Sequence, residues 1–209
     1  DYFDYIWGPP ARGGARNLYV AIGDVSGKGV PAGLVMVMAR SILRSLVARG
    51  ARPQDVLRES NRLLKQDLKP GMFMSMLLAT LDGPTGRLLM AGCGHERPLV
   101  FRAAQRTVER LDLGGLVLGV VPDNGPYLEE HQVALGPGDQ VLLYTDGVTE
   151  GVDTARRPYG IERLEALLRE HGHEPPGALL ERILADTAAH AGEALQHDDI
   201  TLIGIRRPA

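Results

Sequence analysis

The stretch IGDVSGKGVPA, residues 22–32, decides how this chain is expected to fold. An apolar run over residues 18–22 leads into it and predicts a strand. Glycines then follow at a spacing typical of a turn, and Pro31 is well placed as the first residue of a helix that continues to about residue 49. Asp24 is therefore predicted at the end of a strand, directly before a glycine-rich turn.

The remaining predicted elements form runs of strands and pairs of helices. A strand over residues 1–7 precedes a turn that contains Gly13 and Gly14, and a second helix begins near Pro53 and ends before Pro70. Further strands are predicted over residues 73–81, 87–93, 98–102, 108–111, 127–135, 140–145 and 200–205, and two more helices have apolar positions over 161–168 and 179–187.

This order of elements favours one fold class. Short turns between strands favour antiparallel pairing, and helices grouped in pairs argue against a doubly wound parallel sheet. The predicted class is α+β: a four-layer α-β-β-α sandwich of two antiparallel sheets, with a helix pair on each outer face. We interpret residues 1–209 as a single domain and, because the chain opens on Asp1 in a strand-like run, as a fragment of a longer protein.

The composition narrows the classes of partner and location. Lys and Arg number 23 against 26 Asp and Glu, so no basic surface predicts a nucleic-acid partner. Cys93 is the single cysteine, which excludes an intrachain disulfide and favours a cytoplasmic setting. The longest uninterrupted apolar run, residues 34–39, ends at Arg40, far short of the ~18 residues of a membrane helix, so no membrane insertion is expected.

Aspartates stand at the ends of four predicted strands: Asp1, Asp24, Asp146 and Asp198. The ordinary role of any one of them is to cap a turn or a helix. If the fold brings them together, carboxylates ~4 Å apart repel by ~4 kcal/mol at an effective dielectric constant of ~20, and they need cations. A ligand set of oxygens alone selects Mg²⁺ or Mn²⁺ over Zn²⁺. Periodicity does not show whether the aspartates converge.

Five motifs resemble those of metal-dependent PPM-type serine/threonine phosphatases of the bacterial SpoIIE/RsbU branch. They occur in the family order at residues 1–4, 22–32, 94–98, 143–150 and 198–201. The third departs from the family pattern, because Glu96 and Arg97 replace Asn and Pro after His95. We therefore assign His95 no catalytic role and expect it to structure its loop.

The resemblance implies two Mn²⁺ or Mg²⁺ ions held by this chain. Asp24 would bridge both ions, Asp146 and Asp198 would bind the first, and Asp1 and the backbone carbonyl of Val25 would bind the second. Asp199 and Ser26 would lie next to these ligands. Two such cations would lower the pKa of a shared water, and the resulting hydroxide would attack phosphorus in line with the leaving oxygen.

The resemblance also implies a substrate and partners. The substrate would be a phosphoserine or phosphothreonine on a STAS-type anti-sigma-factor antagonist. An upstream sensory domain would control the activity. Formation of a homodimer is a further alternative that the sequence leaves undecided.

Two other functions are alternatives for this sequence. Residues 27–32 fit a G-x-G-x-x-A dinucleotide fingerprint, but the next predicted element is a second helix and not a parallel strand. The other is a catalytically silent PPM-like module that only binds its partner. No predicted ligand is missing from the sequence, and this favours the enzyme.

Overall fold

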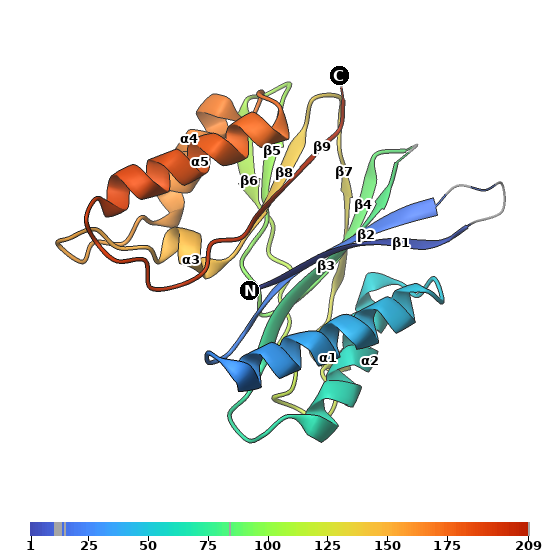
Figure 1. The fold of residues 1–209 in the computed structure, drawn as a ribbon. Coiled ribbons are helices and arrows are strands. Elements are labelled where there is room, and N and C mark those ends of the chain that lie inside the picture. The colour runs from blue at the N-terminus through green and yellow to red at the C-terminus, as the bar shows by residue number, and fades with distance from the viewer. Residues whose placement is uncertain (11–13, 15, 84, 209) are drawn as a thin grey trace. The chain divides into compact units, whose positions relative to one another are not determined.

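The computed structural model describes residues 1–10, 14, 16–83 and 85–208, which form two compact units (Figure 1). The first unit comprises Asp1–His95 and Leu113–Ala134, and the second comprises Glu96–Asp112 and Leu135–Ala209. The single domain proposed over residues 1–209 stays a prediction. Gly13, which was placed in a predicted turn, lies outside the described residues.

The first unit is built on a five-stranded antiparallel sheet of order β1-β2-β3-β4-β7. Its strands are β1 (Tyr2–Pro10), β2 (Arg16–Val25), β3 (Met74–Asp82), β4 (Arg87–Cys93) and β7 (Glu130–Ala134). The 3₁₀ helix η1 (Gly125–Tyr127) precedes β7. Residues 127–135 were predicted as one strand, but their start belongs to η1 and its exit, so the strand begins only at Glu130.

Helices α1 (Val30–Val47) and α2 (Pro53–Asp67) pack together against one face of this sheet (Figure 1). The core between them contains Leu43 of α1, Leu64 of α2 and Met76 of β3, each with no exposed surface. Apolar residues recur along α1 at helical spacing, so burying that stripe stabilises both the helix and the sheet beneath it.

A buried carboxylate ties the edge strand to α1. Arg44 donates from Nη2 to Asp4 Oδ1 (2.6 Å) and from Nε to Asp4 Oδ2 (2.7 Å), and the Tyr2 hydroxyl donates to Asp4 Oδ2 (3.1 Å). We call Tyr2, Asp4 and Arg44 the β1–α1 triad. It places Asp1, the neighbour of Tyr2, at a strand end that is anchored to a helix.

By length and composition alone, α1 could also cross a membrane. In this unit it instead buries Val35, Ala39 and Leu43 against the sheet and α2, and core helices commonly pass the same test. The expected absence of membrane insertion stays a prediction, because α1 is long and apolar enough to span a membrane.

The second unit has a four-stranded antiparallel sheet of order β6-β5-β8-β9. Its elements are β5 (Leu99–Arg102), β6 (Thr107–Arg110), β8 (Gln140–Tyr144), α3 (Asp146–Thr149), α4 (Ile161–His171), α5 (Pro176–Ala191) and β9 (Leu202–Arg206). Phe101 and Leu142 of the sheet form a core with Leu168 of α4 and Ile183 of α5. An added Cβ at Gly172 would lie 2.4 Å from the Phe101 ring, so this helix end requires a glycine.

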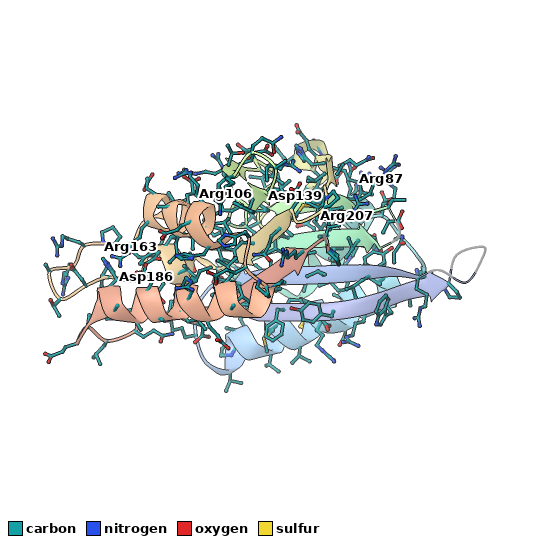
Figure 2. All side chains as sticks on the ribbon, turned by 90° about the horizontal axis from the view of Figure 1, so that it is seen from above. Arg87, Arg106, Asp139, Arg163, Asp186 and Arg207 are labelled. Atoms are coloured by element: carbon teal, nitrogen blue, oxygen red, sulfur yellow. The ribbon has the colours of Figure 1, made fainter. Side chains whose placement is uncertain are left out.

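A second triad joins the helices of this unit, and we call Tyr159, Asp186 and Arg163 the α4–α5 triad. The Tyr159 hydroxyl donates to Asp186 Oδ2 (2.6 Å), and Arg163 donates to both oxygens of the same carboxylate (2.8 Å each). Figure 2 labels Arg163 and Asp186 on these helices.

The predicted α+β class is confirmed: each unit is an antiparallel sheet with a helix pair packed on it. Most strand and helix ends fall within two residues of their predicted places, and β4 spans the predicted residues. The four-residue helix α3 was not predicted, because a single turn has no periodicity to detect.

Candidate functional site

The first group of predicted ligands lies at one end of the sheet in the first unit. Asp24 is the penultimate residue of β2, and Tyr2 pairs with Gly23, so Asp1 and Asp24 reach the same sheet end. The main-chain nitrogen of Asp1 lies 3.5 Å from Asp24 Oδ1. The structure therefore places Asp1 and Asp24 at one end of the sheet, and their role as ligands of a common centre stays a prediction.

The turn after Asp24 is held against the entry to β3. The main-chain N–H of Ser26 donates to the Phe73 carbonyl, and the main-chain N–H of Phe73 donates to Ser26 Oγ, both at 2.9 Å. Gly27 then has a φ of +86°, a conformation that side chains with a Cβ rarely adopt. Ser26 thus fixes the main chain directly after Val25, whose carbonyl is a predicted ligand.

Sequence reasoning missed Ser75, which lies opposite Asp24 on β3. The Asp24 main-chain N–H donates to Ser75 Oγ (3.3 Å), and that hydroxyl lies 2.9 Å from His95 Nδ1. The polar Ser75 inside the apolar run of β3 was the available signal. The contact gives His95 a place in supporting the Asp24 strand end.

The second group of predicted ligands lies in the second unit. Asp146 begins α3 directly after β8, and Asp198 and Asp199 lie just before β9. The main-chain N–H of Thr145 donates to the Thr201 carbonyl (3.2 Å), and the main-chain N–H of Thr201 donates to Thr145 Oγ1 (3.0 Å). We call this pair the Thr145–Thr201 clasp.

A glycine brings the two segments of this group into contact. A Cβ added at Gly147 would lie 2.0 Å from the Asp199 carbonyl oxygen, so only glycine fits there. Asp146 and Asp198 also line the same cavity. Asp146 and Asp198 thus share one cavity, and the main chain of Asp199 contacts α3 at Gly147.

Negative charge accumulates around Asp146. Burial raises the pKa of Glu96, and the nearby charges of Asp146 and Glu150 raise this pKa further. A divalent cation would offset this repulsion. Carboxylates of Asp146, Glu150 and Asp198 line one cavity, and carboxylate oxygens fit a hard metal such as Mg²⁺ or Mn²⁺.

In the part of the chain that the structure describes, no three His, Cys, Asp or Glu side chains are grouped closely enough to hold a metal ion. Asp1 and Asp24 belong to the first unit, and Asp146 and Asp198 to the second. The complete ligand set of Asp1, Asp24, Val25, Asp146 and Asp198 therefore stays a prediction.

Comparison with known proteins assigns the chain, across both units, to a family. A family model described as Stage II sporulation protein E (SpoIIE) matches residues 14–208. Phosphoserine phosphatase RsbU of Bacillus subtilis is 33% identical over 196 residues, which cover 92% of this chain and 56% of that protein. The chain thus spans little more than half the length of this curated relative.

Solved structures share the fold across both units. The RsbU and RsbW domains of Rv1364c from Mycobacterium tuberculosis match with a TM-score of 0.82 and 26% identity, over 99% of this chain and 56% of that one. The SiaA-PP2C domain of Pseudomonas aeruginosa matches with a TM-score of 0.81 and 24% identity, over 98% and 80%. RsbX, solved in complex with magnesium, matches with a TM-score of 0.64 and 14% identity, over 98% and 86%.

Proposed function

Because the chain belongs to the SpoIIE family, whose model matches residues 14–208, we propose that it is a metal-dependent protein phosphatase. Its substrate would be a phosphoserine or phosphothreonine on a partner protein. The observation that supports this proposal is the placement of the predicted ligands within each unit: Asp1 and Asp24 lie at one sheet end, and Asp146 and Asp198 line one cavity. The relative named phosphoserine phosphatase RsbU supports the same reaction.

The residues present fit two divalent cations. Asp24 would bridge them, Asp146 and Asp198 would hold one, and Asp1 with the Val25 carbonyl would hold the other. Bound Mn²⁺ or Mg²⁺ would supply an activated water and offset the charge of the phosphoryl group. The magnesium complex of RsbX, which has this fold, supports the choice of metal.

The chain's own residues would keep these ligands in place. Ser26 clamps the turn after Asp24 against Phe73, and the Thr145–Thr201 clasp fixes the strand ends that lead to Asp146 and Asp198. In the reaction, a water oxygen adds to phosphorus and the bond from phosphorus to the serine oxygen breaks. That oxygen takes a proton, so the products are serine and inorganic phosphate.

For the partner, we propose a phosphorylated STAS-type anti-sigma-factor antagonist in the cytoplasm. The resemblance to RsbU and to the RsbU domain of Rv1364c supports this choice. Since the chain spans 56% of its relative RsbU, we also propose that the full protein has an upstream sensory domain. A homodimer is compatible with this proposal.

The test is manganese-dependent hydrolysis of p-nitrophenyl phosphate and of a phosphoserine protein. We expect Asp24→Asn and Asp146→Asn to abolish turnover, and calorimetric titration to show weaker Mn²⁺ binding by each variant. Asp67→Asn changes an exposed aspartate at the end of α2 and is the control. No turnover with any divalent metal would instead support the catalytically silent binding module.

A further inference from the structure

A cavity of about 430 Å³ opens in the second unit beside two predicted metal ligands. Asp146 and Asp198 line it together with residues of α3, of α5 and of the segment that follows α5. Its volume is in the range of pockets that bind small ligands or side chains, roughly 300–1,000 Å³. Whatever binds at Asp146 and Asp198 therefore has an open pocket next to it.

One face of α5 forms an apolar wall of this cavity. Leu184, Thr187, Ala188 and Ala191 follow one another at spacings of three, one and three residues, so they lie on the same side of the helix. The two alanines leave the space that larger side chains would fill. The wall can therefore receive an apolar group without displacing part of the core.

The floor of the cavity is buried, whereas its rim is open to water. Val148 and Tyr159 line the floor and are no more than 4% exposed. At the rim, Leu184 is 45% exposed and Leu195 is 80% exposed. Two leucines held in water beside an apolar cavity would lose that exposure when an apolar group binds, which favours binding.

The wall is also fixed before any ligand arrives. In the α4–α5 triad the hydroxyl of Tyr159, which lies just before α4, donates to Asp186 of α5. Figure 2 labels Arg163 and Asp186. His190 lies 3.0 Å through Nε2 from the Arg157 carbonyl, so this nitrogen donates, and Nδ1 accepts from Arg163 Nη1 at 3.2 Å. Each of these polar groups has its partner, so the cavity needs little rearrangement on binding.

We propose that this cavity binds an apolar side chain of the phosphoprotein substrate, a few residues from the phosphoserine. The inference rests on the proposed function, because it assumes that the phosphoryl group binds a divalent cation held by Asp146 and Asp198. Protein chain on either side of that group must then cross the neighbouring surface, where the cavity opens. The carboxylates of Asp146, Glu150 and Asp198 at the same cavity would disfavour an acidic side chain there.

The experiment uses pairs of phosphoserine peptides that differ by Leu or Ala at one position, scanned over four residues on each side. We expect the protein with Mn²⁺ to hydrolyse the Leu peptide with a kcat/KM about ten- to one-hundred-fold higher at one position. Fluorescence polarisation with the same pair, made with a non-hydrolysable phosphonate, should show the same preference in Kd. This second readout does not depend on turnover.

Filling the cavity should remove the preference. In Ala188→Trp the indole would occupy the cavity, so the ratio of the two peptides should fall to about one, whatever the absolute rate. Ala189→Trp is the matched control on the same helix, because Ala189 is exposed and does not line the cavity. Should Ala188→Trp fail to fold, Leu195→Ser at the exposed rim gives the second variant, with an expected loss of about half the preference or more.

The outcomes separate this inference from the proposed function. Failure to hydrolyse p-nitrophenyl phosphate with any divalent metal would overturn the proposed function, and with it the premise. Hydrolysis of p-nitrophenyl phosphate without preference at any peptide position would overturn the cavity proposal alone. So would a preference that Ala188→Trp and Leu195→Ser leave unchanged.

Discussion

The two units support their aspartates with the same two devices in different settings. In each unit a glycine beside a predicted ligand lets two main chains touch: Gly23 of β2 lies against Ser75, and Gly147 of α3 lies against Asp199. Each unit also has a Tyr–Asp–Arg triad. In the first unit the glycine lies between two long paired strands and the triad joins β1 to α1. In the second unit the glycine lies in a four-residue helix against a loop, and the triad joins two helices. We infer that the second group of aspartates depends more on single contacts.

The glycines give the largest expected effect. In Gly147→Ala the new Cβ would lie 2.0 Å from a main-chain oxygen, so the segment at Asp199 must move. We expect the free energy of unfolding in urea to fall by about 3 kcal/mol or more, with loss of metal-dependent turnover. Gly23→Ala, with its Cβ 2.4 Å from the Ser75 carbonyl oxygen, should cost less, about 1–3 kcal/mol.

Gly33→Ala is the control for both glycine variants. Gly33 lies within α1, and nothing is within 4 Å of its added Cβ. This substitution should stabilise the chain by about 0.5–1 kcal/mol. If Gly147→Ala were as stable as Gly33→Ala, the contact between α3 and the segment before β9 would not matter for stability.

Substitutions in the triads give the next largest expected loss of stability. Here the larger loss is expected in the first unit, whereas for the glycines it is expected in the second. The side chain of Asp4 is 10% exposed and that of Asp186 is 28% exposed, so the Asp4 carboxylate is less accessible to water. We expect Asp4→Asn to lower the free energy of unfolding by about 1–3 kcal/mol, and Asp186→Asn by about 1 kcal/mol or less. Urea unfolding measures both, with exposed Asp67→Asn expected to change stability by less than about 0.5 kcal/mol.

Equal losses in the two triad variants would remove the distinction between a strand-to-helix and a helix-to-helix contact. A larger loss for Asp186→Asn would reverse it. Either result would show that burial of the carboxylate does not set the strength of these triads.

Periodicity and turn chemistry predicted most of the fold. Strand β4 was placed to the residue because a turn-forming stretch precedes it and Gly94 follows it. Apolar spacing likewise predicted α1 and α2. The pattern of Arg40 and Arg44 resembles a solvated helix face, and only the structure shows that Arg44 reaches a buried carboxylate 40 residues away.

The candidate site was harder to predict, because its residues meet through register and not through sequence spacing. Ser75 supports Asp24 from 51 residues away, across the pairing of β2 and β3. Strand β7 joins β4 after an excursion into the second unit, which no local pattern signals. Their position at predicted strand ends singled out the aspartates, but only the family resemblance implied that they act together, since strand-end aspartates alone do not indicate convergence.

Smaller effects are expected where single hydrogen bonds support the two groups of ligands. Thr145→Val keeps the shape of the side chain but removes the acceptor for the Thr201 main-chain N–H. We expect a loss of about 1–2 kcal/mol and a lower turnover number, because the clasp holds the strand ends that lead to Asp146 and Asp198. Ser75→Ala removes the acceptor of the longer bond from the Asp24 N–H, 3.3 Å, and also the 2.9 Å contact to His95 Nδ1. Because β3 is paired on both sides, we expect a loss of about 1 kcal/mol.

The smallest expected effect is a pH dependence of the stability that each triad contributes, and its size differs between the two triads. Burial acts to raise the pKa of Asp4, but the hydrogen bonds and charge of Arg44 outweigh it, so the folded-state pKa lies below the usual value. A lowered pKa contributes stability above the unfolded-state pKa of ~3.9, and this stability is lost as the pH falls through the folded-state value. The stability difference between the unmodified chain and Asp4→Asn should therefore narrow when urea unfolding is repeated from pH 6 down to pH 3. Asp186, whose pKa is lowered mainly by Arg163, should show the same narrowing from a smaller starting difference. A difference that stays constant with pH would mean that Asp4 contributes by its packing and not by its charge.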